Sequence, residues 1–131
     1  MKRITLFLAL ITLSFSNAQL TFNSLEKMQQ PFSFTQQSII ARLMATQAKQ
    51  IEEGKMTEFE SRCISSNIVV MMGDTNAERF TAIAEKAYAH QMESLSVDEI
   101  NFMQTVNDKY MTVLAIVAEE CSQKPQKETH E

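Results

Sequence analysis

The chain has 131 residues, of which 44% are hydrophobic, and a formal net charge of −4. A chain of this length forms one small domain, and its acidic balance argues against a nucleic-acid partner and against docking on anionic lipid. Only two glycines are present, which are too few for a phosphate-binding glycine loop or a Gly-x-Ser-x-Gly nucleophile turn.

The first 18 residues have the features of a secretory signal peptide. Two basic residues open the chain, residues 4–15 form an apolar run, and Ser16 and Ala18 occupy the small-residue positions of a cleavage site. The run is shorter than the roughly 20 residues that span a bilayer. We therefore expect export, to a bacterial periplasm or outside the cell, of a mature chain that begins at Gln19 and has no membrane anchor. Cleavage removes two basic and no acidic residues, so the net charge becomes −6.

Helical patterns follow, which predict an all-α fold. Three of them begin with a capping box, at Thr57, Thr75 and Ser96, where a hydroxyl accepts from an early backbone N–H and a glutamate three positions later bonds back. The predicted helices cover residues 33–53, 57–72, 75–94 and 96–121, with a short helix from about Ser24 before them. Residues 122–131 are polar and are expected to be disordered. The single helical domain therefore spans residues 19–121.

The last helix is the expected centre of the bundle of four to five helices. Its apolar positions recur in steps of three and four from Ile100 to Cys121. Between Met111 and Ala118 the helix is apolar almost all round, so neighbours should cover it on most sides. Asn107 is the one polar residue of the stripe, and it either bonds a backbone carbonyl, sets the packing register or faces a pocket.

Cys63 and Cys121 are the two cysteines of the chain, and in an exported protein they most simply form one disulfide. Cys63 lies early in its predicted helix, whereas Cys121 ends the last one. Because a disulfide needs Cα atoms about 6 Å apart, the two helices should run antiparallel. The long loop that the bond closes should make it worth about 4 kcal/mol.

Residues that could carry chemistry are few, and no cofactor is expected. The chain has no His-Glu-x-x-His and no Cys-x-x-Cys, and the pair His90 and Glu93 is a single, reversed version of the motif that di-metal bundles repeat. Nine methionines occur, and thioethers can bind Cu(I). Because no methionine cluster repeats, these side chains are better interpreted as adaptable core filler or as a soft recognition surface.

Ile68, Val69 and Met72 are the candidate partner-binding residues. They belong to a run of five apolar residues, 68–72, which cannot all face inward from one side of a helix. We expect part of this face at the surface, as the interface of a homodimer or of another partner. The alternative is that the segment packs beneath the first long helix or the N-terminal residues.

The sequence as a whole is interpreted as a small exported, non-enzymatic protein. It would bind another protein, as an inhibitor, an immunity factor or an accessory subunit. Two alternatives stay open: a periplasmic copper carrier that uses His and Met ligands, and an enzyme without a recognised motif.

Overall fold

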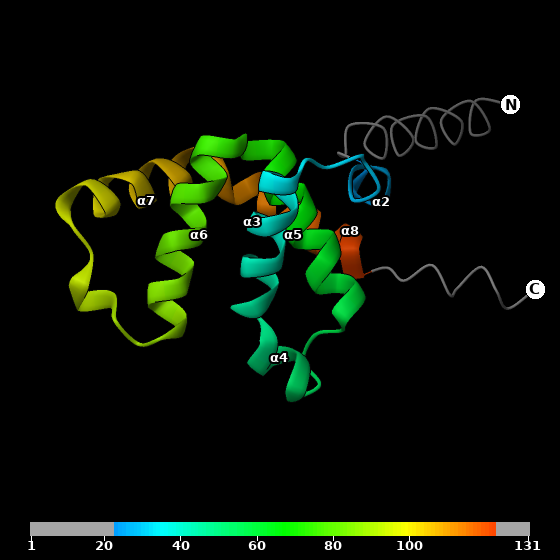
Figure 1. Ribbon diagram of the computed structural model, residues 1–131, viewed down its shortest axis with the longest axis horizontal. Coiled ribbons are helices and arrows are strands. Elements are labelled where there is room, and N and C mark those ends of the chain that lie inside the picture. The colour runs from blue at the N-terminus through cyan, green and yellow to red at the C-terminus, as the bar shows by residue number, and fades with distance from the viewer. Residues whose placement is uncertain (1–22, 123–131) are drawn as a thin grey trace, which may run out of the picture.

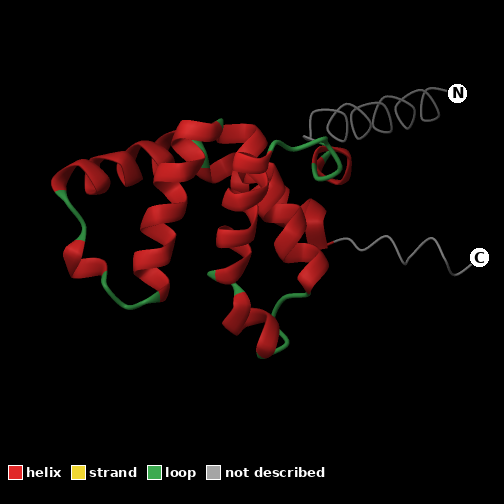
Figure 2. Cartoon of the chain, viewed as in Figure 1, coloured by secondary structure: helices red, strands yellow, loops and turns green. Residues whose placement is uncertain are grey.

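The computed structural model describes residues 23–122. Within this range the chain forms helices and no strand, which confirms the predicted all-α, bundle-like fold (Figures 1 and 2). There are more helices than predicted, because long helices are broken into shorter ones. The elements are α2 (Ser24–Lys27), α3 (Phe34–Ala45), α4 (Ala48–Glu52), α5 (Glu58–Met72), α6 (Asp74–Tyr88), the 3-10 helix η1 (Met92–Ser94), α7 (Val97–Lys109) and α8 (Met111–Ser122).

Helix α5, and not the C-terminal helix, is the centre of the fold. It packs against α2, α3, α6 and α8, and eight of its residues are buried, compared with two in α8. The buried set includes the polar residues Ser61, Ser65 and Ser66, so the central helix is not the most apolar one in sequence. Helix α8 lies along one side of α5, so Met111 and Ile116 keep exposed fractions of 48% and 38%.

Ile68, Val69 and Met72 lie in the core, so the predicted exposure of this face is wrong. Their exposed fractions are 4%, 1% and 6%, and they pack in one cluster with Ile39 and Leu43 of α3. Helices α3 and α6 both contact α5, so its apolar run is covered from more than one side. The folded domain therefore does not offer these three residues to a partner.

Two predicted helices are interrupted without a glycine or a proline. The predicted helix 33–53 breaks at residues 46–47, where the Thr46 hydroxyl donates to the Leu43 carbonyl at 2.6 Å. The predicted helix 96–121 breaks at Tyr110, whose φ of −116° and ψ of −15° depart from the helical values. Helices α7 and α8 therefore follow different directions, as their ribbons show in Figure 1.

The third predicted helix, 75–94, differs at both ends. It begins at Asp74 after Gly73, whose φ of +83° favours glycine, and no side chain caps it, so the predicted Thr75 box is not formed. It ends at Tyr88, and His90 then adopts a φ of +60° that ends the helical path. The chain can thus turn back, and η1 leads it to the start of α7.

The predicted disulfide is confirmed, with the Cα atoms of Cys63 and Cys121 5.7 Å apart. The bond places the end of α8 beside the first half of α5. This agrees with the antiparallel course that was predicted for the two helices. Close by, the Ser24 amide and hydroxyl donate to Glu120 Oε1 at 3.2 Å and 2.6 Å, which ties α2 to α8. Residues from both ends of the described chain therefore lie beside α5.

None of the helices between residues 23 and 122 has the length and apolar character needed to cross a bilayer. The predicted signal segment, residues 1–18, lies outside the described residues, as does the predicted tail apart from Ser122, which ends α8.

Candidate functional site

Exposed apolar side chains gather where η1, α7 and the start of α8 meet. Seven large apolar side chains are exposed between residues 23 and 122, and three of them, Met92, Ile100 and Met111, line one groove with exposed fractions of 49%, 47% and 48%. Exposed apolar residues that occur singly are normal, whereas a cluster marks a candidate site. This α7 groove has a volume of about 390 Å³ and is completed by Leu95, Met103, Gln104, Val106 and Asn107.

The helical repeat of α7 presents one face of the helix to the groove. Ile100, Met103 and Asn107 follow one another in steps of three and four, so they lie on the same face. Val106 is fully buried beneath them. Leu95, at the end of η1, approaches from the other side because the chain turns back after His90. The turn after His90, which the sequence did not predict, therefore brings Leu95 to the groove.

Ionic and capping contacts hold η1 and α7 in place. The Lys86 ammonium lies 2.9 Å from Glu99 Oε1 and also donates to the Ser94 carbonyl at 3.3 Å. Glu99 accepts the Ser96 backbone N–H at 2.8 Å, which confirms the predicted capping box. The pKa of Glu99 is lowered, first by the Ser96 amide and then by Lys86. These contacts position η1 against α7.

The α7 groove carries no charged side chain. Its polar members are Gln104 and Asn107, both exposed. Of the three interpretations of Asn107, the one in which it faces a pocket agrees with its position. The stripe that contains Ile100 and Met103 was visible in the sequence, whereas the contribution of Met92 and Leu95 was not, because it depends on the turn at His90.

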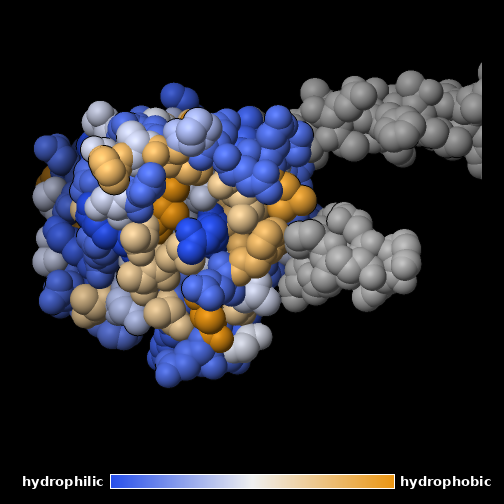
Figure 3. Space-filling model, turned by 45° about the vertical axis from the view of Figure 1, so that its right-hand side comes forward, coloured by the Kyte–Doolittle hydropathy of each residue, from blue (hydrophilic) through white to orange (hydrophobic). Residues whose placement is uncertain are grey.

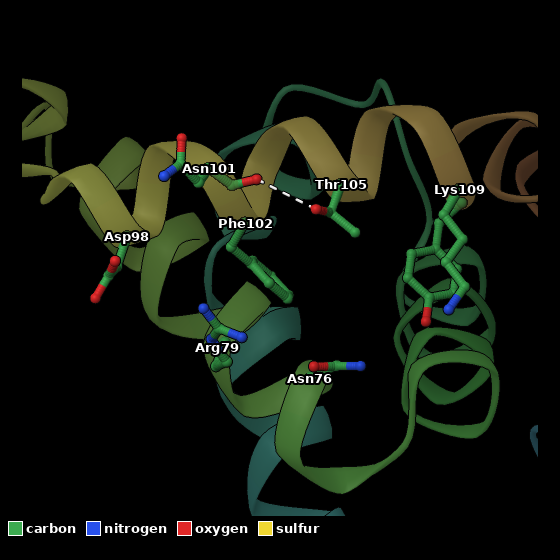
Figure 4. Close-up of a pocket in the computed structure, with 8 residues that line it drawn as sticks. Asn76, Arg79, Asp98, Asn101, Phe102, Thr105 and Lys109 are labelled. Carbon is green, nitrogen blue, oxygen red and sulfur yellow. Dashed lines mark hydrogen bonds between the residues drawn. The ribbon is translucent and has the colours of Figure 1, made fainter.

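The opposite face of α7 lines a smaller and more polar pocket, against α6, of about 290 Å³ (Figure 4). The Arg79 guanidinium lies 4.2 Å from the centroid of the Phe102 ring, a cation–π contact that packs α6 on α7. The Thr105 hydroxyl donates to the Asn101 carbonyl at 3.3 Å. Because these residues are engaged in packing and local hydrogen bonds, the α7 groove is the stronger candidate.

The structure separates His90 and Glu93, the pair that resembles a reversed half of the di-metal motif. His90 leaves the helix with its positive φ, so it does not share a helical face with Glu93, and it lines a pocket with Lys49 and Tyr88 instead. Residues 23–122 contain no group of three or more His, Cys, Asp or Glu side chains that could hold a metal ion. Three thioethers, those of Met92, Met103 and Met111, do line the α7 groove.

Comparison with known proteins finds no match for the chain among protein-family models, curated proteins or solved structures. No relative therefore indicates a ligand or a partner. The α7 groove on the surface of the molecule is therefore the main structural indication of a binding site.

Proposed function

We propose that the protein is a small exported, non-enzymatic protein that binds another protein through the α7 groove, as an inhibitor, an immunity factor or an accessory subunit. The observation that carries this is the cluster of Met92, Ile100 and Met111, each about half exposed, around one uncharged groove. Covering apolar surface releases about 25 cal/mol per Å². The signal-like segment of residues 1–18 and the Cys63–Cys121 disulfide support export.

The lining of the groove indicates what a partner would present to it. The centres of protein interfaces are poor in charge and rich in apolar anchors, and the groove has three methionines that can adapt to an inserted side chain. Gln104 and Asn107, on the exposed side, can hydrogen-bond the backbone around such an anchor. The net charge of −6 expected for the mature chain, with 10 basic and 16 acidic residues, favours a partner with a basic surface.

A capture experiment from the envelope fraction of the producing cell tests this function. Ile100→Asp places a carboxylate at the rim, where the exposed fraction of 47% lets the fold tolerate it. Asn101→Asp is the matched control, because this exposed residue lines the opposite pocket. The unmodified protein and the control should capture the same protein, and Ile100→Asp should lose it although its circular dichroism is unchanged.

Two results would contradict the proposal. Equal capture by Ile100→Asp and the unmodified protein would exclude the groove as the binding surface. A concentration-dependent dimer of the pure protein, measured by sedimentation and broken by Ile100→Asp alone, would identify a second copy of the chain as the occupant.

A copper carrier is the second candidate, because Met92, Met103 and Met111 line the same groove. Thioethers are soft ligands that suit Cu(I). Changing all three methionines to leucine nearly conserves side-chain volume but removes the sulfur atoms. A protein-binding groove should keep its partner after this change, whereas a copper site should lose its Cu(I) in anaerobic titration against a competing chelator.

A further inference from the structure

A second groove lies between the segment before α3, helix α3 and helix α5, and we call it the α3–α5 groove. Its volume is about 700 Å³, within the range of roughly 300–1,000 Å³ that is usual for small-molecule sites. It shares no lining residue with the α7 groove. Figure 3 shows that apolar residues form a band on the face it draws, with strongly hydrophilic side chains set into it. The apolar lining of the groove comprises Met28, Pro31, Phe32, Ile40, Ala41 and Met44.

Arg62 is the one charged residue that lines this groove. Among residues 23–122, no carboxylate pairs with Arg62 and no group hydrogen-bonds to its side chain. Arg42, in contrast, holds Glu78 and Glu85 at 2.8 Å and 2.9 Å. Arg62 is exposed, so its planar set of N–H donors is available to a ligand.

Ser66 adds a second donor at the same place. It lines the groove although its exposed fraction is 1%, and its hydroxyl bonds to no other residue in the range 23–122. Ser66 is four positions after Arg62 on α5, so the two side chains lie on one face of the helix. Together with Gln30 and Gln37, which also line the groove, they give it polar groups beside its apolar lining, and Arg62 adds one positive charge.

We infer that the α3–α5 groove binds an amphipathic carboxylate such as a fatty acid. The guanidinium of Arg62 accommodates a carboxylate through two parallel N–H···O bonds, and the Ser66 hydroxyl donates to the same group. The aliphatic part lies along Phe32, Ile40 and Met44. A single cation matches a single negative charge, whereas a phosphate monoester carries up to about two at neutral pH.

Calorimetric titration with laurate, below its micelle concentration, tests this site in the disulfide-bonded protein. Laurate should bind at one site, and dodecanol and dodecyltrimethylammonium, which share its chain but not its charge, should bind at least about tenfold more weakly. Arg62→Gln should weaken laurate binding by a similar factor. Lys49→Gln removes the same charge from α4 outside the groove and should leave the affinity unchanged.

Two further variants locate the site and separate it from the proposed function. Ala41→Phe fills the groove from an exposed position of α3 and should abolish binding, whereas Ala45→Phe, on the same helix outside the lining, should not. Ile100→Asp should bind laurate normally, because the α7 groove is separate. The inference is overturned if laurate does not bind, if dodecanol binds equally well, or if Arg62→Gln or Ala41→Phe leaves the affinity unchanged.

Discussion

At the scale of single residues, buried polar groups join three helices. Asn67 has an exposed fraction of 1%, and its Nδ2 donates to the Ser24 carbonyl at 3.1 Å and to the Cys63 carbonyl at 2.8 Å. Glu120 in turn accepts the backbone N–H of Ser24, at the start of α2, as a local capping residue would. One amide of α5 and one carboxylate of α8 therefore hold α2.

Replacing Asn67 by leucine, which has the same branched shape but no hydrogen-bonding group, should destabilise the protein. The carbonyl groups of Ser24 and Cys63 would lose a buried donor, and the expected loss in the free energy of unfolding is about 1–3 kcal/mol. Urea denaturation measures it, with the exposed Asn101→Leu as a control that should change stability by less than about 0.5 kcal/mol. Equal midpoints for the two variants would show that the buried amide contributes nothing.

The pairing of Arg42 with Glu85 predicts a dependence of stability on pH. The guanidinium lowers the pKa of Glu85 below its ordinary value of 4.5. A carboxylate with a lowered pKa in the folded state stabilises it above the unfolded pKa, and this contribution is lost as the pH falls through the folded pKa. The gain is about 1 kcal/mol or less, because exposed fractions of 33% and 41% leave the pair screened by water.

Denaturation of the unmodified protein and of Glu85→Gln at several pH values checks this. The stability difference should be present at neutral pH and should shrink as the pH falls below 4.5. Added salt should reduce it as well. A difference that stays constant from neutral to acid pH would show that it does not arise from the charge of Glu85.

At the scale of elements, capping boxes decide where several helices begin. The Thr57 hydroxyl accepts the Glu60 N–H at 3.0 Å and Glu60 accepts the Thr57 N–H at 2.7 Å. Ser96 and Glu99 repeat the arrangement. The same motif at Thr75 is not used, because α6 already begins at Asp74 after Gly73. A sequence motif therefore acts as a cap only where the backbone enters the helix at that residue.

Thr57→Ala and Thr75→Ala should differ in their effects for this reason. Loss of a used cap costs about 1 kcal/mol, with a range of about 0.5–2. Thr75 is exposed and forms no cap, so its replacement should change the unfolding free energy by less than about 0.5 kcal/mol. Thermal or urea denaturation of both variants distinguishes them, and a larger loss for Thr75→Ala would place the start of α6 at the predicted residue.

Much of the element pattern could be predicted from sequence, and the interruptions could not. Helix α5 begins directly after its capping box at Thr57 and ends before Gly73, both of which are local signals. The breaks at residues 46–47 and at Tyr110 involve no glycine or proline, so packing, which local sequence does not encode, decides them. The α7 groove was missed for the same reason, since Leu95 reaches it only through the turn at His90.

At the scale of the whole molecule, the disulfide is the main covalent constraint on the fold. It joins residues 58 positions apart and links the central helix α5 to α8. A crosslink of this span lowers the entropy of the unfolded chain. In the chain-entropy model, this stabilises the folded state by about 4 kcal/mol. In a domain whose total stability is about 5–15 kcal/mol, this is a large share.

Reduction should therefore lower the unfolding free energy of the protein by about 4 kcal/mol. The variant with both Cys63→Ala and Cys121→Ala should show a similar loss without any reductant and should not respond when one is added. Denaturation with and without a thiol reductant makes the comparison. An unmodified protein that denatures at the same urea concentration in both conditions would contradict it.

The contact between Ser24 and Glu120 also determines when the domain can be completed during synthesis. Its two residues are 96 positions apart, so helix α2 can pack on α5 earlier but lacks its contact with Glu120 until nearly all of the described chain has been made. Until then, the hydrogen bonds between Ser24 and Glu120 cannot form, and neither can the disulfide between Cys63 and Cys121. A nascent chain released before Glu120 should accordingly lack native protection of α2 from hydrogen exchange. The cap that Glu120 provides for α2 therefore forms only once α8 has been made.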